Sequence, residues 1–313
     1  MIEADKTMED VGPGPSRDLA AYAMVAGCFA LVGLSGSLVS WATAPGSVLL
    51  VLRFSIAAAV LLAVFARRRP LRGVFRRDMW LKLLLMGLLD GGSLLAYFFA
   101  VRSVGVAVAT FLLFVQPVWV ALLAPRIVKT PTERVVFASL GLALVGLGVI
   151  LAPSLLGDGV HLPAIGLAVG LTAGLCYAGF QLLVKGLTRE FTSITIVIVE
   201  CTLDTLVILP LAVWQLAAAG ASLTSRDLVA AVVLGLLCTA VAYTMWVEGV
   251  ARLRVQHSAI LGFLTPVAAP LFDWLLLGEA ITVPIALGGV LIVAAGILVV
   301  VLGRGDVERE LPL

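Results

Sequence analysis

Long apolar stretches, separated by short polar breaks, run along almost the whole chain. Each is about 20 residues long, the length that an α-helix needs to cross the hydrocarbon core of a bilayer. The breaks are rich in glycine, proline and charged residues, and none is long enough for a soluble domain. The pattern therefore predicts ten transmembrane helices. They are expected at residues 19–42, 46–66, 80–101, 105–127, 135–153, 163–185, 192–216, 228–248, 257–277 and 282–302.

The second half of the chain repeats the first. Sliding residues 101–125 onto 250–274 aligns many apolar positions and matches Pro117 with Pro266. A proline inside a helix removes a backbone hydrogen bond and kinks the helix, so both are expected helix kinks. Because each half holds five segments, an odd number, the halves lie in opposite orientations, as in many secondary transporters. We expect an all-α membrane protein of ten transmembrane helices, formed by two inverted five-helix repeats.

Four regions follow from this organisation. They are a disordered cytoplasmic tail at 1–18, a first repeat at 19–153, a second repeat at 160–302 and a cytoplasmic tail at 303–313.

The composition excludes several classes of protein. The chain is 61% hydrophobic and 13% charged, with a mean hydropathy of +1.14, far from a soluble domain. A net charge of only +2 implies no nucleic-acid partner. His161 and His257 have no ligands at metal-binding spacing, and the four cysteines fit small buried side chains, so we expect no metal and no cofactor. No G-x-x-x-x-G-K-[ST] motif occurs, which excludes ATP drive within this chain.

The basic residues indicate the orientation in the membrane. Nearly all lysines and arginines outside the apolar segments fall in alternate loops and in the tails, whereas Arg102 and Arg226 fall on the other side. Loops rich in lysine and arginine stay in the cytoplasm. We therefore expect a multi-pass protein of the inner (plasma) membrane with both termini cytoplasmic.

The chain resembles the drug/metabolite transporter superfamily, specifically permeases made of two EamA repeats. The resemblance covers about residues 20–302, and before the fifth helix the first half departs from it. It rests on Arg53-Phe54, on the Pro117 and Pro266 helices, on Leu277-Gly278-Glu279 and on the spacing of Gly289 and Gly296. It implies ten helices, a central cavity and transport of small metabolites such as amino acids, with export as the expected direction.

Five ionisable residues stand out within the apolar segments. Such groups are costly in a membrane, and those that remain usually face a cavity or a partner. They are Arg53, Asp90, Glu200, Asp204 and Asp273.

Asp90 and Asp204 are expected near the midplane, and Glu200 lies one helical turn from Asp204 on the same face. Desolvation disfavours the charged form of a carboxyl group, so these acids are candidates to bind a proton or cation. The alternative is a protonated acid that hydrogen-bonds a neighbouring helix and has only a structural role.

Arg53 and Asp273 both fall in the outer third of the membrane and are a candidate outer gate pair. Alternatively, each caps a helix end or meets interfacial water. Arg53 also fits a residue that holds the fold or binds a substrate carboxylate.

Polar and aromatic side chains at intermediate depth complete the candidate binding site. Tyrosine near a segment end is more often an interfacial anchor than a ligand, but several of these residues lie deeper. The candidates are Tyr97, Gln116, Tyr177, Tyr243, Ser258 and Thr265.

The sequence therefore predicts a secondary permease that moves a small metabolite by alternating access, with the lipid bilayer and a small-molecule substrate as partners and protons as a further candidate. An uptake permease or facilitator for a cationic metabolite fits the intramembrane acids as well. A membrane-embedded enzyme is the alternative from another class, but no clustered catalytic residues support it. The pattern does not identify the substrate.

Overall fold

The structure, a computed structural model, describes residues 18–68, 71, 73–156, 163–219 and 223–303. Both expected tails, apart from Asp18 and Gly303, and the linker with His161 lie outside these residues. Within the described parts every regular element is helical. Ten helices are long and apolar enough to cross a membrane, which confirms the predicted fold class.

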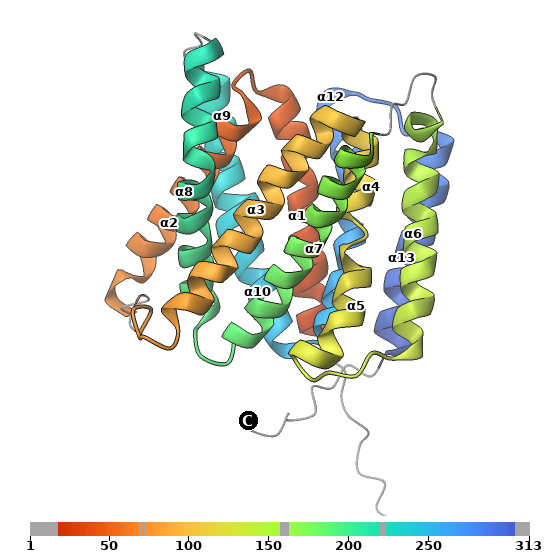
Figure 1. Ribbon diagram of the computed structural model, residues 1–313. Coiled ribbons are helices and arrows are strands. Elements are labelled where there is room, and N and C mark those ends of the chain that lie inside the picture. Colours follow the sequence, from red (N-terminus) through yellow and green to blue (C-terminus); the bar gives the residue numbers. More distant parts are fainter. Residues whose placement is uncertain (1–17, 69–70, 72, 157–162, 220–222, 304–313) are drawn as a thin grey trace, which may run out of the picture.

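The first repeat contains five spans that pass up and down through the molecule (Figure 1). Their helices are α1 (Leu19–Trp41), α2 (Gly46–Phe65), α3 (Trp80–Val104), α4 (Val106–Leu113) with α5 (Gln116–Ile127), and α6 (Arg134–Leu155).

The second repeat follows the same plan in the opposite direction. Its helices are α7 (Ala164–Leu187), α8 (Ser193–Ala219), α9 (Ser225–Gly235) joined through a π-helical turn (Leu236–Val241) to α10 (Ala242–Arg252), α11 (Val255–Leu261) joined through a 3₁₀ turn (Gly262–Leu264) to α12 (Thr265–Leu277), and α13 (Val283–Leu302).

Local sequence explains where these helices start and stop. The Thr224 side chain and Asp227 form a capping box at the start of α9. Gly105 (φ 82°) ends α3, and Gly278 (φ 74°) ends α12 in the left-handed conformation that glycine adopts without strain.

The fourth and ninth spans are both interrupted near the middle. The first break lies between α4 and α5, and the second at the 3₁₀ turn between α11 and α12. Pro117 and Pro266 stand in the first turn after each break, where the missing N–H costs little. The two prolines therefore start the second half of each broken span instead of kinking a continuous helix.

Helix contacts reveal a pseudo-two-fold relation between the repeats. The helix α1 packs against α10 and α12, and its counterpart α7 packs against α3, α4 and α5. The pairs α2–α8 and α6–α13 each contain equivalent helices from the two repeats. In Figure 1 the α6–α13 pair stands at one side of the bundle. We call the end where α1 begins and α13 ends the lower end, and the opposite end the upper end.

Small residues allow the equivalent helices α6 and α13 to approach closely. A Cβ at Gly146 would lie 2.7 Å from the Gly288 carbonyl oxygen, and the reverse contact is as tight. Gly141 has open space around it, and Gly289 has only ordinary van der Waals contacts. The α6–α13 crossing therefore lies at Gly146 and Gly288.

Candidate substrate and coupling site

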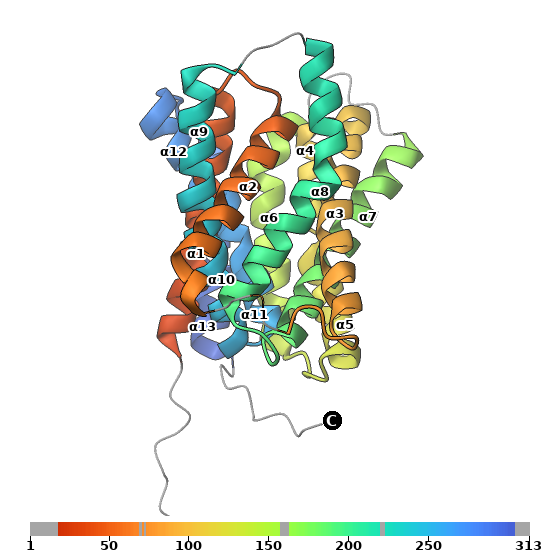
Figure 2. The ribbon, with the colours of Figure 1, turned by 90° about the vertical axis from the view of Figure 1, so that its left-hand side faces the viewer.

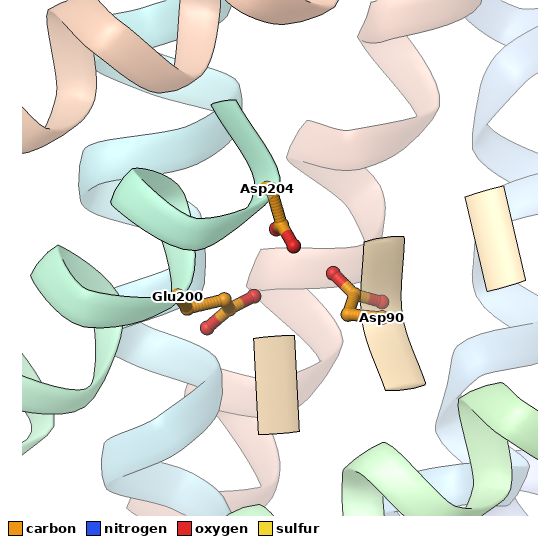
Figure 3. A group of neighbouring side chains, drawn as sticks. All are labelled: Asp90, Glu200 and Asp204. Atoms are coloured by element: carbon orange, nitrogen blue, oxygen red, sulfur yellow. The ribbon is translucent and has the colours of Figure 1, made fainter. Parts of the chain in front are cut away.

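Three carboxyl groups meet in the interior, between the two repeats. Asp90 comes from α3, whereas Glu200 and Asp204 lie one turn apart on α8 (Figure 3). One carboxylate oxygen of each lies within 4.8 Å of those of the other two. Their exposed fractions are 5%, 1% and 0%, respectively. We call these three residues the acidic triad.

Glycines on α3 make this meeting possible. Gly87 and Gly91 flank Asp90 and face α8, where a Cβ at Gly87 would overlap the Leu203 side chain. A Cβ at Gly91 would lie 2.7 Å from a methyl group of Val207. Larger residues at these positions would push α8 away from α3, because packed helices cannot absorb such an overlap without moving.

Half of the triad's six oxygens have no hydrogen-bond donor outside the triad. Among the described residues these are both carboxylate oxygens of Asp204 and Oε2 of Glu200, whereas Asp90 and Asp204 are placed to share a proton in a hydrogen bond. Buried polar groups are normally hydrogen-bonded, and the exceptions cluster at functional sites. Three negative charges this close in apolar surroundings also repel one another. The arrangement therefore favours binding of a proton or another cation.

A buried arginine supplies positive charge near the triad. Arg53 on α2 is 7% exposed, and its electrostatic interactions reach all three acids. Its Nη2 donates a hydrogen bond to the Tyr243 hydroxyl at 2.8 Å, and its guanidinium lies 4.8 Å from the Phe54 ring centre. Within the described parts of the chain it forms no ion pair with a carboxylate, and its Nε has no hydrogen-bond partner.

The expected outer gate pair is not formed. Asp273 on α12 accepts a hydrogen bond from Ser37 on α1 at 2.6 Å, whereas Arg53 binds Tyr243. The physical reason is lateral position, because α12 packs against α1 while α2 packs against α8 and α9. A similar depth in the membrane therefore does not bring the two side chains together.

The remaining candidates divide into two sets. Tyr177 and Tyr243 lie within electrostatic range of Asp90 and Glu200. Tyr177 also stacks on Phe180, with ring centres 5.7 Å apart. Gln116 lies in the first turn of α5, 3% exposed, and its Oε1 has no hydrogen-bond partner.

The second set is engaged elsewhere. Tyr97 lies 3.0 Å from the Thr110 hydroxyl, and Thr265 donates to the backbone of Phe29. Ser258 accepts a hydrogen bond from the Trp246 indole at 3.1 Å. These contacts join helices to their neighbours and do not involve the acidic triad.

Sequence reasoning missed Lys185, which lies near the end of α7. Its Nζ donates to the backbone oxygens of Val250, Ala251 and Leu253, at 2.9, 3.2 and 2.8 Å. These carbonyls belong to the end of α10, where cations are favourable. The signal available was a lysine at the end of the expected segment 163–185, four residues after Gln181 and on the same helical face.

The two ends of the molecule are packed differently. At the lower end α5 contacts α11, and α10 contacts α7 and α8. By the pseudo-two-fold relation, the α5–α11 pair corresponds to α12–α4 at the upper end. The pairs of α10 with α7 and α8 correspond to the pairs of α3 with α1 and α2. No comparable contact occurs between those upper partners within the described residues. Figure 2 shows α12 and α4 well separated at the upper end.

Ten spanning helices in two inverted repeats, with ionisable groups buried where the repeats meet, define a multi-pass membrane transporter. The chain belongs to the EamA-like transporter family, which matches residues 19–152 and 164–302, one match in each repeat. This result confirms the resemblance drawn from the sequence.

Individual relatives agree with this assignment. The chain is 28% identical to the threonine/homoserine exporter RhtA of Escherichia coli K12 over 268 residues, 84% of each protein. It is also 28% identical to an uncharacterized transporter of Archaeoglobus fulgidus over 204 residues, 65% of this chain and 70% of that protein. A solved crystal structure with 19% identity matches 92% of this chain and 99% of its own, with a TM-score of 0.76, and shows the same fold.

Proposed function

We propose that this EamA-type transporter is a secondary carrier that exports a small amino acid or a related metabolite across the inner membrane by alternating access, driven by protons. The observation that carries the proposal is the acidic triad, three buried carboxyl groups at the junction of the repeats, half of whose oxygens have no donor outside the triad among the described residues. Secondary carriers bind substrate and coupling ion at such junctions. The similarity to threonine/homoserine exporters supports the substrate class and the direction.

Proton coupling follows from the chemistry of the triad. A buried carboxyl group that has no fixed partner gains a proton readily and loses it when one side of the membrane opens to water. With both termini in the cytoplasm, as the basic loops indicate, the upper end faces outward. Protons entering there would reach the triad while the substrate leaves.

Uptake or facilitated movement of a cationic metabolite is the second candidate. The same unpartnered carboxylates favour it, since they would bind a cationic group directly without any proton. The two candidates differ in how transport responds to a pH gradient.

The test uses the purified full-length protein in liposomes. Labelled amino acids and other metabolites are supplied outside, with and without an imposed pH gradient. Gradient-driven accumulation of an amino acid is the expected result, and Asp204→Asn should abolish it. Thr202→Val is the matched control, because Thr202 lies on the same helix and donates only to the Ile198 carbonyl. Strictly downhill movement, indifferent to the gradient, would remove the proton from the proposal, and turnover in detergent without a membrane would indicate an enzyme.

A further inference from the structure

Opposite charges are buried near one another in the site without forming an ion pair. Arg53 lies on α2 and Asp90 on α3, and α8, which carries Glu200 and Asp204, contacts both of these helices. The arginine is only 7% exposed, yet its described hydrogen bond goes to Tyr243 and not to a carboxylate. Burying charges that remain unpaired is unfavourable unless something compensates both of them.

Each side of this arrangement offers unused hydrogen-bonding capacity. On the positive side, Nε of Arg53 has no partner in the described parts of the chain, and a guanidinium can hold a carboxylate through two parallel hydrogen bonds. On the negative side, no described residue outside the triad donates to either oxygen of Asp204 or to Oε2 of Glu200. Figure 3 shows the three carboxyl groups of the triad converging on a common point.

A ligand that compensates both sides must carry both a cation and an anion. An ammonium group has three donors, which suits three converging carboxylates, and it lacks acceptors. A carboxylate attached through one carbon to that ammonium would then be directed toward a planar cation. This combination is the backbone part of a free α-amino acid.

We propose that the site recognises its substrate as a zwitterion, with the acidic triad binding the α-ammonium group and Arg53 binding the α-carboxylate. This proposal rests on the proposed function, since it specifies how an amino-acid carrier selects its substrate. Arg53 is thus a specificity-determining residue, and the Tyr243 hydroxyl and the Phe54 ring hold its guanidinium in position.

Access from one side is consistent with the packing of the helices. The upper ends of α2 and α3 lack the contact that their counterparts α8 and α10 make at the lower end. Since Arg53 and Asp90 lie on these two helices, a ligand between them would enter or leave through the upper end.

Competition in liposomes tests the proposal on the unaltered protein. Counterflow of labelled L-threonine is measured against unlabelled L-threonine, the corresponding amino alcohol, which lacks the carboxylate, and N-acetyl-L-threonine, which lacks the ammonium group. Only the free amino acid should compete, with both analogues weaker by about 100-fold, because each leaves one buried charge unpaired. An amino alcohol that competes as well as L-threonine would overturn the role of Arg53, while the exporter function would stand.

Variants then assign the two charges to residues. Arg53→Gln should weaken competition by L-threonine by about 100-fold and leave competition by the amino alcohol nearly unchanged. The variant would then no longer distinguish the two compounds. A purely structural arginine would instead weaken both equally, which would overturn the proposal. If Arg53→Gln does not fold, two other measurements test the role of Arg53. They are Arg53→Lys, which keeps the charge but loses the planar fork, and the competition on the unaltered protein. Should no amino acid move at all, the proposed function and this inference both fail.

Discussion

The lower and upper ends of the molecule are built from equivalent helices, yet these helices are joined to one another more extensively at the lower end. There Lys185 of α7 binds the end of α10, and Gln256 of α11 donates to the Thr130 carbonyl of the α5–α6 loop. His257 meets the Tyr22 hydroxyl of α1 at 2.6 Å. The last two contacts tie α11, the lower half of the ninth span, to the first repeat.

The polar contacts of the upper end leave two groups of helices unconnected. Asp227 of α9 accepts hydrogen bonds from the backbone of Thr43 and Ala44 in the α1–α2 loop, and Ser37 joins α1 to α12. Tyr97 joins α3 only to α4. No hydrogen bond among the described residues links these two groups at that end. The comparison indicates that the sequence can form a closed end, and that the protein stands in a state with its lower end closed.

Cross-linking compares the two ends most directly. In a variant with the four native cysteines replaced, Ala124→Cys with Ala259→Cys tests the lower end, where both residues are fully buried in one apolar cluster. The repeat alignment maps this pair onto Asp273 and Thr110, so Thr110→Cys with Asp273→Cys is the equivalent upper pair. A short bifunctional reagent should link the lower pair almost completely and the upper pair hardly at all.

Substrate turnover should shift that balance, because alternating access exchanges the closed and open ends. Adding substrate with a gradient is expected to raise the yield at the upper pair and to lower it at the lower pair. Equal yields for both pairs in the resting protein would contradict the difference between the ends.

Removing one lower contact should loosen that end specifically. Lys185→Met deletes a buried cation and leaves the carbonyls of Val250, Ala251 and Leu253 without this donor, which should cost about 2–3 kcal/mol of stability. Hydrogen exchange is expected to accelerate in residues 250–258 and to stay unchanged at the start of α9.

Lys82→Met provides the matched control, because Lys82 lies on α3 with its side chain exposed. Hydrogen-exchange protection of residues 250–258 is compared between the two variants. If it is the same in both, the lysine does not hold the lower end closed.

The sequence predicted the spans and the repeat because these depend on local properties. Apolar length and alternating basic loops are sufficient to place helices in a membrane. The pairing of Glu200 with Asp204 was also predictable, since residues four apart share a helical face. That these acids are functional remains a prediction.

Lateral packing could not be predicted in the same way. Asp90 reaches the other two acids because Gly87 and Gly91 fit against Leu203 and Val207, a complementarity between residues far apart in the chain. Depth alone suggested a contact between Arg53 and Asp273. Because α12 packs against α1, Asp273 instead accepts a hydrogen bond from Ser37. The donors that Lys185 supplies to α10 likewise follow from tertiary packing.

The smallest expected effect concerns the ion pair at the rim of the lower end. Arg254 Nη1 lies 3.1 Å from Glu133 Oε1, with both side chains partly exposed at 12% and 16%. Because glutamine keeps an oxygen that accepts from Arg254, and Nη1 also donates to the Pro131 carbonyl, Glu133→Gln should cost no more than about 1 kcal/mol. It should lower the thermal midpoint only slightly and leave the cross-linking yield of the lower pair nearly unchanged. A loss as large as that expected for Lys185→Met would mean that closure of the lower end depends on its rim charges, and that the buried lysine is not its main support.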